Sequence, residues 1–182
     1  MTTEPAGPAE KGWWGPRIWR ILHSLAEIND RTDVGPAWRQ ALLLTAEVLP
    51  CAVCREHFRT HVRGMIFPIG VSNYATLRRN LWSVHAGTVS AREPFPEERL
   101  VTEYGGEREE IVMRVTHLLS EVVTAFQTYG VLDRLHAVSL SAWQRAVSQL
   151  IALLRYPHPP ARQRVVRVAP PSVQRRGMIR HR

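Results

Sequence analysis

The fold is decided by residues 13–26, which read Trp-Trp-Gly-Pro-Arg-Ile-Trp-Arg-Ile-Leu-His-Ser-Leu-Ala. Pro16 suits the first turn of a helix, because proline lacks the N–H that would be unpaired there, and we predict a helix from Gly15 to about Ile28. Trp19 and His23 lie one turn apart on a face that also carries aliphatic side chains. Such a stripe is ordinarily core, but an indole and an imidazole at this spacing could also flank a planar ligand.

The rest of the chain is also predicted to be helical. Helix start and stop signals, together with apolar periodicity, predict further helices at 36–49, 50–63 and 72–89. A connection that contains Pro, Glu and Gly is predicted to follow at 93–106. Two more apolar stripes at helical spacing run through 111–126 and 140–154. This second pair could complete the first bundle, form a dimer interface or serve as a binding platform. Core packing is its default interpretation.

We therefore predict an all-α protein. Its expected parts are a flexible N-terminus at 1–11, a four- or five-helix bundle at 12–95, an additional helical region at 106–155 and a disordered Arg/Pro-rich tail at 156–182. A chain of 182 residues with 45% hydrophobic content can bury one core. Its apolar runs are too short and too broken to span a membrane, and its start does not resemble a secretory signal. These features favour a soluble protein made in the cytosol.

Positive charge is concentrated in the tail. The chain carries a net charge of +8, and residues 156–182 contain seven arginines and no acidic residue, so about +1 is left for the rest. Five prolines oppose independent folding of this segment. The tail could bind nucleic acid or another acidic surface, or it could simply keep the protein in solution.

Cys51 and Cys54 are the only cysteines, and they stand in the run Pro50-Cys51-Ala52-Val53-Cys54 at the start of a predicted helix. The unpaired N–H groups and the dipole of a helix N-terminus favour thiolate over thiol, so the position suits a reactive pair. A lone C-x-x-C also fits half of a metal site or a coincidence.

Zinc is the first rival interpretation, because His57 and His61 complete a C-x2-C-x2-H-x3-H pattern. On one helix this pattern spans about 15 Å, whereas zinc holds its ligands at about 2.0–2.3 Å. One straight helix cannot wrap a metal with all four side chains. We expect no metal here and interpret both histidines as polar residues on the helix surface.

Three blocks of the sequence together resemble a known family. They are Gly15-x3-Trp19-x3-His23, Pro50-Cys51-x2-Cys54-x3-Phe58 and Leu81-Trp82-Ser83-Val84-His85. Their order and spacing are similar to those of the Erv/ALR family of FAD-linked sulfhydryl oxidases, and the single cysteine pair and added helices resemble the versions encoded by large DNA viruses. The resemblance implies a small helical bundle that holds FAD against a redox-active disulfide. It implies catalytic roles for Cys51 and Cys54 and cofactor contacts from Gly15, Arg17, Trp19, His23, Phe58, Trp82, His85 and Arg92.

The chain departs from the family after His85. The family continues from this histidine as H-N-x-x-N, whereas this chain reads His85-Ala86-Gly87-Thr88-Val89, and the lysine usual in this stretch is absent. Arg78, Arg79 or Arg92 could supply the charge for the phosphates, since guanidinium groups make bidentate phosphate contacts.

The resemblance also implies a mechanism. A substrate thiolate attacks Cys51, Cys54 lies under the flavin, and electrons pass through FAD to oxygen to give hydrogen peroxide. Without a shuttle cysteine pair, the protein is expected to take electrons directly from a thiol-containing protein, such as a thioredoxin-like carrier.

Family members also suggest a homodimer, located in the cytoplasm of an infected host cell or in the virion, with the mitochondrial intermembrane space as the alternative. The competing hypothesis is a non-enzymatic helical adaptor. In that case the C-x-x-C is structural or redox-regulated, and the basic tail binds nucleic acid.

Overall fold

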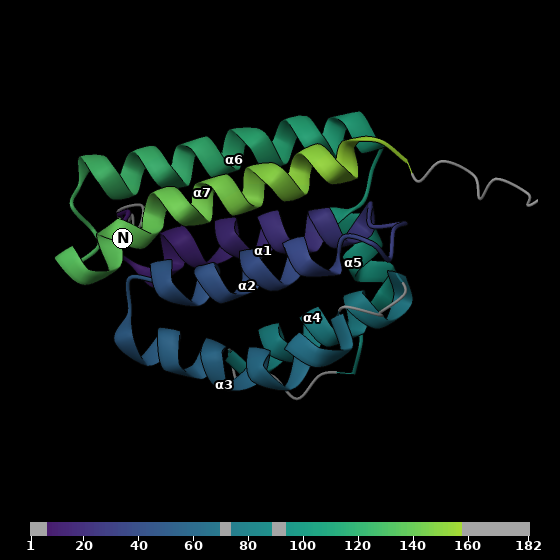
Figure 1. Ribbon diagram of the computed structural model, residues 1–182, viewed down its shortest axis with the longest axis horizontal. Coiled ribbons are helices and arrows are strands. Elements are labelled where there is room, and N and C mark those ends of the chain that lie inside the picture. Colours follow the sequence, from purple (N-terminus) through teal and green to yellow (C-terminus); the bar gives the residue numbers. More distant parts are fainter. Residues whose placement is uncertain (1–6, 70–73, 89–93, 158–182) are drawn as a thin grey trace, which may run out of the picture.

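The computed structural model describes residues 7–69, 74–88 and 94–157 (Figure 1). Within these ranges the chain forms seven helices and no strand: α1 (Lys11–Glu27), α2 (Gly35–Val48), α3 (Ala52–Ile69), α4 (Tyr74–Thr88), α5 (Glu97–Tyr104), α6 (Arg108–Thr128) and α7 (Arg134–Arg155). The prediction of an all-α bundle with additional C-terminal helices is confirmed. Arg92 and the Arg/Pro-rich tail from residue 158 onward lie outside the described residues, as do residues 1–6.

The helices are stacked in three layers (Figure 1). The pair α1 and α2 forms the middle layer, with α6 and α7 on one side, α3 and α4 on the other, and α5 at one end. Ile21, Leu25 and Leu42 of the middle layer are 0% exposed. Apolar side chains of α1, α2, α6 and α7 belong to one continuous core. Of the three roles left open for the C-terminal helical pair, the structure therefore shows core packing.

A buried hydrogen bond supports the contact between α2 and α7. Trp143 is 0% exposed, and its indole Nε1 donates to Thr45 Oγ1 at 2.9 Å. The Thr45 hydroxyl in turn donates to the carbonyl of Ala41 at 2.8 Å. Both polar groups of this contact are thus paired inside the core.

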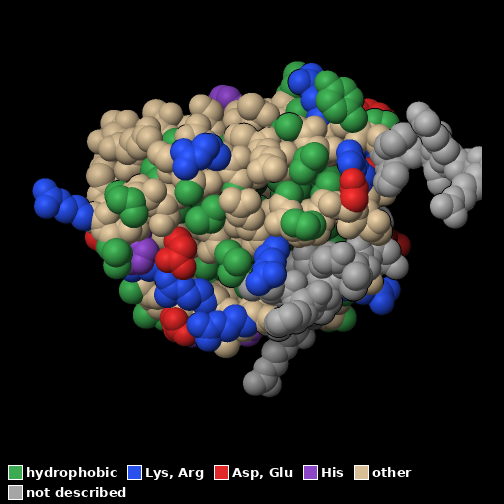
Figure 2. All heavy atoms as spheres, in the orientation of Figure 1, with side chains coloured by type: hydrophobic (Ala, Val, Ile, Leu, Met, Phe, Trp, Pro, Cys, Tyr) green, Lys and Arg blue, Asp and Glu red, His purple; other side chains and the backbone are tan. Residues whose placement is uncertain are grey.

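The outer surface is mixed in character. On the face shown in Figure 2, hydrophobic side chains are scattered, and several Lys and Arg side chains lie next to Asp or Glu. One ion pair connects α2 and α3, where Arg59 Nη2 lies 2.8 Å from Glu47 Oε2. No helix in the described ranges combines the length and the apolar content that crossing a membrane requires.

The connection expected at 93–106 is wrong over Glu97–Tyr104, where the chain forms α5. Pro96 precedes this helix, and Glu97 and Glu98 stand in its first turn, where the helix dipole favours negative charge. Leu100 and Tyr104 lie one turn apart and are 1% and 6% exposed, so they dock α5 on the bundle. The proline and glycine that suggested a loop instead flank a short helix.

Two other helices differ from their expected bounds. Helix α1 begins at Lys11 rather than Gly15, because the Glu10 carbonyl accepts hydrogen bonds from the Trp13 and Trp14 N–H groups at 2.9 and 3.3 Å. Pro16 consequently lies inside the helix and not in its first turn. Helix α3 begins at Ala52 and continues to Ile69, beyond the predicted end at residue 63.

Candidate active site

A disulfide joins Cys51 and Cys54 at the start of α3, with Cα atoms 5.1 Å apart. Cys51 directly precedes the helix, and its carbonyl accepts the Arg55 N–H at 2.9 Å. Its sulfur accepts the N–H of Cys54 at 3.2 Å. A helix N-terminus thus offers both its dipole and an N–H group to Cys51 Sγ, which favours the thiolate when the disulfide opens. The predicted environment of the pair is confirmed.

A cavity of about 940 Å³ lies beside the disulfide. Cys54 lines it, whereas Cys51 is absent from its lining. Four aromatic side chains from three helices also line it: Trp14 and Trp19 of α1, Phe58 of α3 and Tyr104 of α5. Its volume lies at the upper end of the range of roughly 300–1,000 Å³ that is typical of ligand sites. One sulfur of the disulfide therefore belongs to a residue on the wall of a ligand-sized, aromatic cavity.

Four aromatic or imidazole rings, three of which line the cavity, form a stack. The Trp19 and His85 rings stack with centroids 4.1 Å apart and an angle of 11° between their planes. His85 Nδ1 lies 3.0 Å from His23 Nε2, and the His23 ring stacks on Tyr104 at 4.8 Å. Trp19 and His23, the two rings expected to flank a planar ligand, have centroids 5.8 Å apart, and both contact His85. Such a ligand would lie against the cavity face of this stack and not between Trp19 and His85.

Both histidines of this stack are neutral at pH 7. Burial, with smaller contributions from His85 and Arg78, lowers the pKa of His23 from 6.5 to about 3. Burial, together with Arg99, lowers the pKa of His85 from 6.5 to about 4. The contact at 3.0 Å is therefore a hydrogen bond between two neutral imidazoles, in which one ring donates and the other accepts.

The structure brings most of the predicted site residues together. Lining the cavity are Gly15, Arg17, Trp19, Cys54, Phe58 and His85. His23 and Trp82 are buried, at 1% and 7% exposed, and their rings contact His85 from behind the cavity wall. Cys51 does not line the cavity but is joined to Cys54 by the disulfide, and Arg92 lies outside the described residues.

The suggestion that Arg78 supplies charge to a phosphate is not supported. Its side chain is 3% exposed, with Nε 2.7 Å from Glu27 Oε1 and Nη1 3.1 Å from Glu97 Oε1. The buried Arg78 is committed to these carboxylates and does not line the cavity. Arg79 is also absent from the lining, and its guanidinium lies over the Phe95 ring at 5.7 Å.

Arg17 lines the cavity but is already engaged. Its Nε donates to Glu121 Oε1 and its Nη1 to the Trp13 carbonyl, each at 2.9 Å. Its guanidinium carbon also lies 4.1 Å from the centre of the Trp13 ring. Arg17 therefore anchors α1 to α6 as well as bordering the cavity.

Sequence reasoning missed two cations at the cavity. Lys11 and Arg20 line it, both are exposed, and neither forms an ion pair with a described residue. Extending the helical pattern upstream of Gly15 would have placed Lys11 one turn before it, on the same side of α1. A Cβ added at Gly15 would meet only Lys11 Cγ, at 3.7 Å, so the backbone of α1 lies open to the cavity at this position. Lys11 and Arg20 thus bring positive charge to a cavity with space for a ligand, and the carboxylate residue Glu103 also lines it.

No group of three or more His, Cys, Asp or Glu side chains in the described part of the chain is arranged to hold a metal ion. The two cysteines are joined to each other.

Comparison with known protein families, curated proteins and solved structures finds no significant match to this chain. Any assignment of function therefore depends on the residues of the site itself.

Proposed function

We propose that the protein is an FAD-dependent thiol oxidase, which forms disulfide bonds in a partner protein and passes the electrons to oxygen to give hydrogen peroxide. The observation that carries the proposal is the position of Cys54. It joins the disulfide to a cavity of about 940 Å³ whose walls include the rings of four aromatic residues. A dithiol next to a planar ligand site is the arrangement that electron transfer from thiols to a flavin requires.

The residues of the cavity fit FAD. The rings of Trp19, Phe58 and Tyr104 offer flat apolar surface to a tricyclic ring system, and Lys11 and Arg20 offer positive charge to a diphosphate. The open backbone at Gly15 leaves space that any larger side chain would fill. When bound, FAD would supply the capacity to accept two electrons from the dithiol and to be reoxidised by oxygen.

The two cysteines would divide the exchange chemistry. A substrate thiolate attacks Cys51 Sγ, a mixed disulfide forms, and Cys54 leaves as a thiolate on the cavity wall. A second substrate thiolate then attacks the substrate sulfur of the mixed disulfide and releases Cys51. The substrate gains a disulfide, and the cysteine pair gains two electrons and two protons. The Cys54 N–H, which donates to Cys51 Sγ at 3.2 Å, stabilises the Cys51 thiolate that is released.

The neutral His23 and His85 pair would have a positioning role. His85 covers one face of the Trp19 ring at 4.1 Å, and the buried His23 holds His85 through their hydrogen bond. Trp19 therefore keeps its orientation toward the cavity. Because neither imidazole is charged, the part of the wall formed by this stack stays compatible with a flat apolar ring system.

The partner would be a protein that carries its own thiols. Cys51 and Cys54 are the only cysteines of the chain, so no internal pair can relay electrons to them. A thioredoxin-like carrier has the required chemistry. We extend the proposal to a homodimer acting in infected cytoplasm or the virion, with the mitochondrial intermembrane space as the alternative.

The test uses the purified full-length chain. We expect a yellow protein with bound flavin, which consumes oxygen in the presence of dithiothreitol. Cys54→Ser should abolish oxygen consumption and retain the flavin. Ala52→Ser is the matched control, because Ala52 is exposed in the same turn and does not line the cavity. A colourless protein that neither takes up added FAD nor consumes oxygen would refute the proposal and favour the adaptor.

A further inference from the structure

We propose that Arg55 is a positioning residue that holds Cys51 at the N-cap of α3, and that Asp133 at the start of α7 holds Arg55 in turn. The inference rests on the proposed function only in taking the disulfide to open and close. It gives the C-terminal helical pair a part in the redox site, although none of the three familial sequence blocks falls there.

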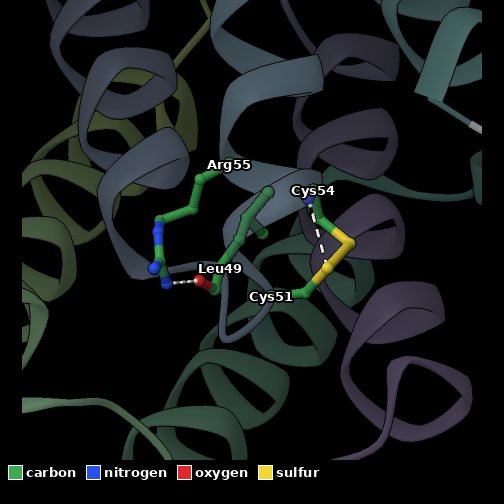
Figure 3. Close-up of a disulfide and its surroundings, with 4 residues drawn as sticks. All are labelled: Leu49, Cys51, Cys54 and Arg55. Atoms are coloured by element: carbon green, nitrogen blue, oxygen red, sulfur yellow. Dashed lines mark hydrogen bonds between the residues drawn. A yellow bond between two sulfur atoms is a disulfide. The ribbon is translucent and has the colours of Figure 1, made fainter.

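Arg55 secures both ends of the turn that carries Cys51 (Figure 3). Its side chain extends to one side of α3 while the disulfide lies on the other. Its Nη1 donates to the Leu49 carbonyl at 2.7 Å, and its backbone N–H donates to the Cys51 carbonyl at 2.9 Å. Leu49 is the C-cap residue that directly follows α2. The Arg55 side chain, which is 10% exposed, thus ties the C-cap residue of α2 to the first turn of α3.

Asp133 holds the other side of the guanidinium. Its Oδ2 lies 3.8 Å from Arg55 Nη2, and its Oδ1 accepts the His136 N–H at 3.0 Å as the N-cap of α7. Hydrogen bonds from His136, with a smaller contribution from Arg55, lower the pKa of Asp133, so its carboxylate stays ionised. An ion pair therefore connects the start of α7 with the start of α3.

The position of this turn matters for the chemistry of Cys51. Its sulfur receives the Cys54 N–H at 3.2 Å only while Cys51 keeps its N-cap conformation. Without the Arg55 side chain the Leu49 carbonyl loses its donor, and the turn can move away from the helix N-terminus. The Cys51 thiolate would then lose an N–H partner and part of the dipole field. The ionisable side chains near this turn on α2 and α3 are Glu47, Arg55, Glu56, His57 and Arg59, and those at the start of α7 are Asp133, Arg134 and His136.

The test measures the reactivity of Cys51 alone. In a Cys54→Ser background of the full chain, Cys51 is the only thiol, and the pH dependence of its alkylation by iodoacetamide reports its pKa. We expect Arg55→Met to raise this pKa by about 1 unit, a tenfold loss of thiolate below the pKa. Arg55→Lys should restore part of the loss, since an ammonium can still donate to the Leu49 carbonyl. Asp133→Asn keeps an N-cap acceptor and should give a smaller rise.

Arg59→Met is the matched control. Arg59 lies one turn further along α3 and also bonds to α2, through Glu47 at 2.8 Å, but it does not contact the turn at Leu49–Cys51. It should leave the pKa of Cys51 unchanged. An unchanged pKa in Arg55→Met, or an equal rise in both variants, would overturn the inference. If Arg55→Met does not fold, the pKa of Cys51 is compared between Arg55→Lys and Arg59→Lys. A rise only in Arg55→Lys supports the inference, and no rise or an equal rise in both overturns it. No flavin enters this assay, so failure here and failure of the oxidase proposal are distinguishable.

Discussion

Mild acid is expected to destabilise the protein through the hydrogen-bonded pair of the buried His23 and the partly buried His85. Their pKa values are about 3 and about 4 in the folded protein and 6.5 in the unfolded chain. Between pH 6.5 and these lower values, the unfolded chain binds protons that the folded protein does not. The free energy of unfolding is therefore highest above pH 6.5 and falls as the pH is lowered.

The size of this effect follows from the pKa differences. Each histidine that is neutral in the folded state and charged in the unfolded state contributes a slope of about 1.4 kcal/mol per pH unit. Integrated to about pH 5, each of two such histidines removes about 2 kcal/mol. His85 borders the cavity, so solvent reduces its share, and we expect a combined loss of about 3 kcal/mol. That is a large part of a typical stability of about 5–15 kcal/mol.

Urea denaturation followed by circular dichroism at several pH values between about 7 and 5 measures this loss. His23→Gln removes one titrating group and should flatten the dependence by about half. His117→Gln is the matched control, because His117 is exposed on α6 and outside the stack. A stability that stays constant over this range would refute the reasoning, as would an unaltered slope in His23→Gln.

Three further substitutions test the packing of the bundle. Thr45→Val should destabilise the protein by about 1–3 kcal/mol in urea denaturation, because the buried Trp143 N–H loses its acceptor. Glu27→Gln weakens the partner of the buried Arg78 guanidinium at 2.7 Å and should destabilise by up to about 3–5 kcal/mol, with a smaller loss if the amide still accepts its hydrogen bond. Leu150→Ala opens a cavity in α7 at a side chain that is 0% exposed, and a drop of about 2–5 kcal/mol is expected. A Leu150→Ala protein as stable as the parent would contradict the assignment of α7 to the core.

Local patterns predicted most of the helices. The helix at 36–49 was found at Gly35–Val48, because Pro36 in its first turn is a signal carried within a few residues. The apolar stripes at 111–126 and 140–154 were found as α6 and α7, because helical periodicity is also a local signal. Helix α5 was missed because it is only eight residues long and is flanked by proline and glycine, which also mark loops.

In the candidate site, too, local contacts were predicted from the sequence and contacts between distant residues were not. The contact between the Cys54 N–H and Cys51 Sγ spans three residues, so the sequence predicted its environment. The closed stack of Trp19 on His85 joins residues far apart in the chain, and the sequence alone suggested an open slot instead. Lys11 and Arg20 escaped notice because an exposed cation on a helix resembles any other until a cavity is seen beside it.

By itself, the sequence determined where most helices lie and that a single cysteine pair stands at a helix N-terminus, because backbone hydrogen bonds and capping act over three or four residues. The tertiary structure alone decided that Cys54 meets an aromatic cavity, that Arg78 is held by Glu27, and that Arg55 reaches Asp133. These relations depend on which faces of distant helices pack together. Core packing is set by the combined fit of many side chains, so no short stretch of sequence encodes it.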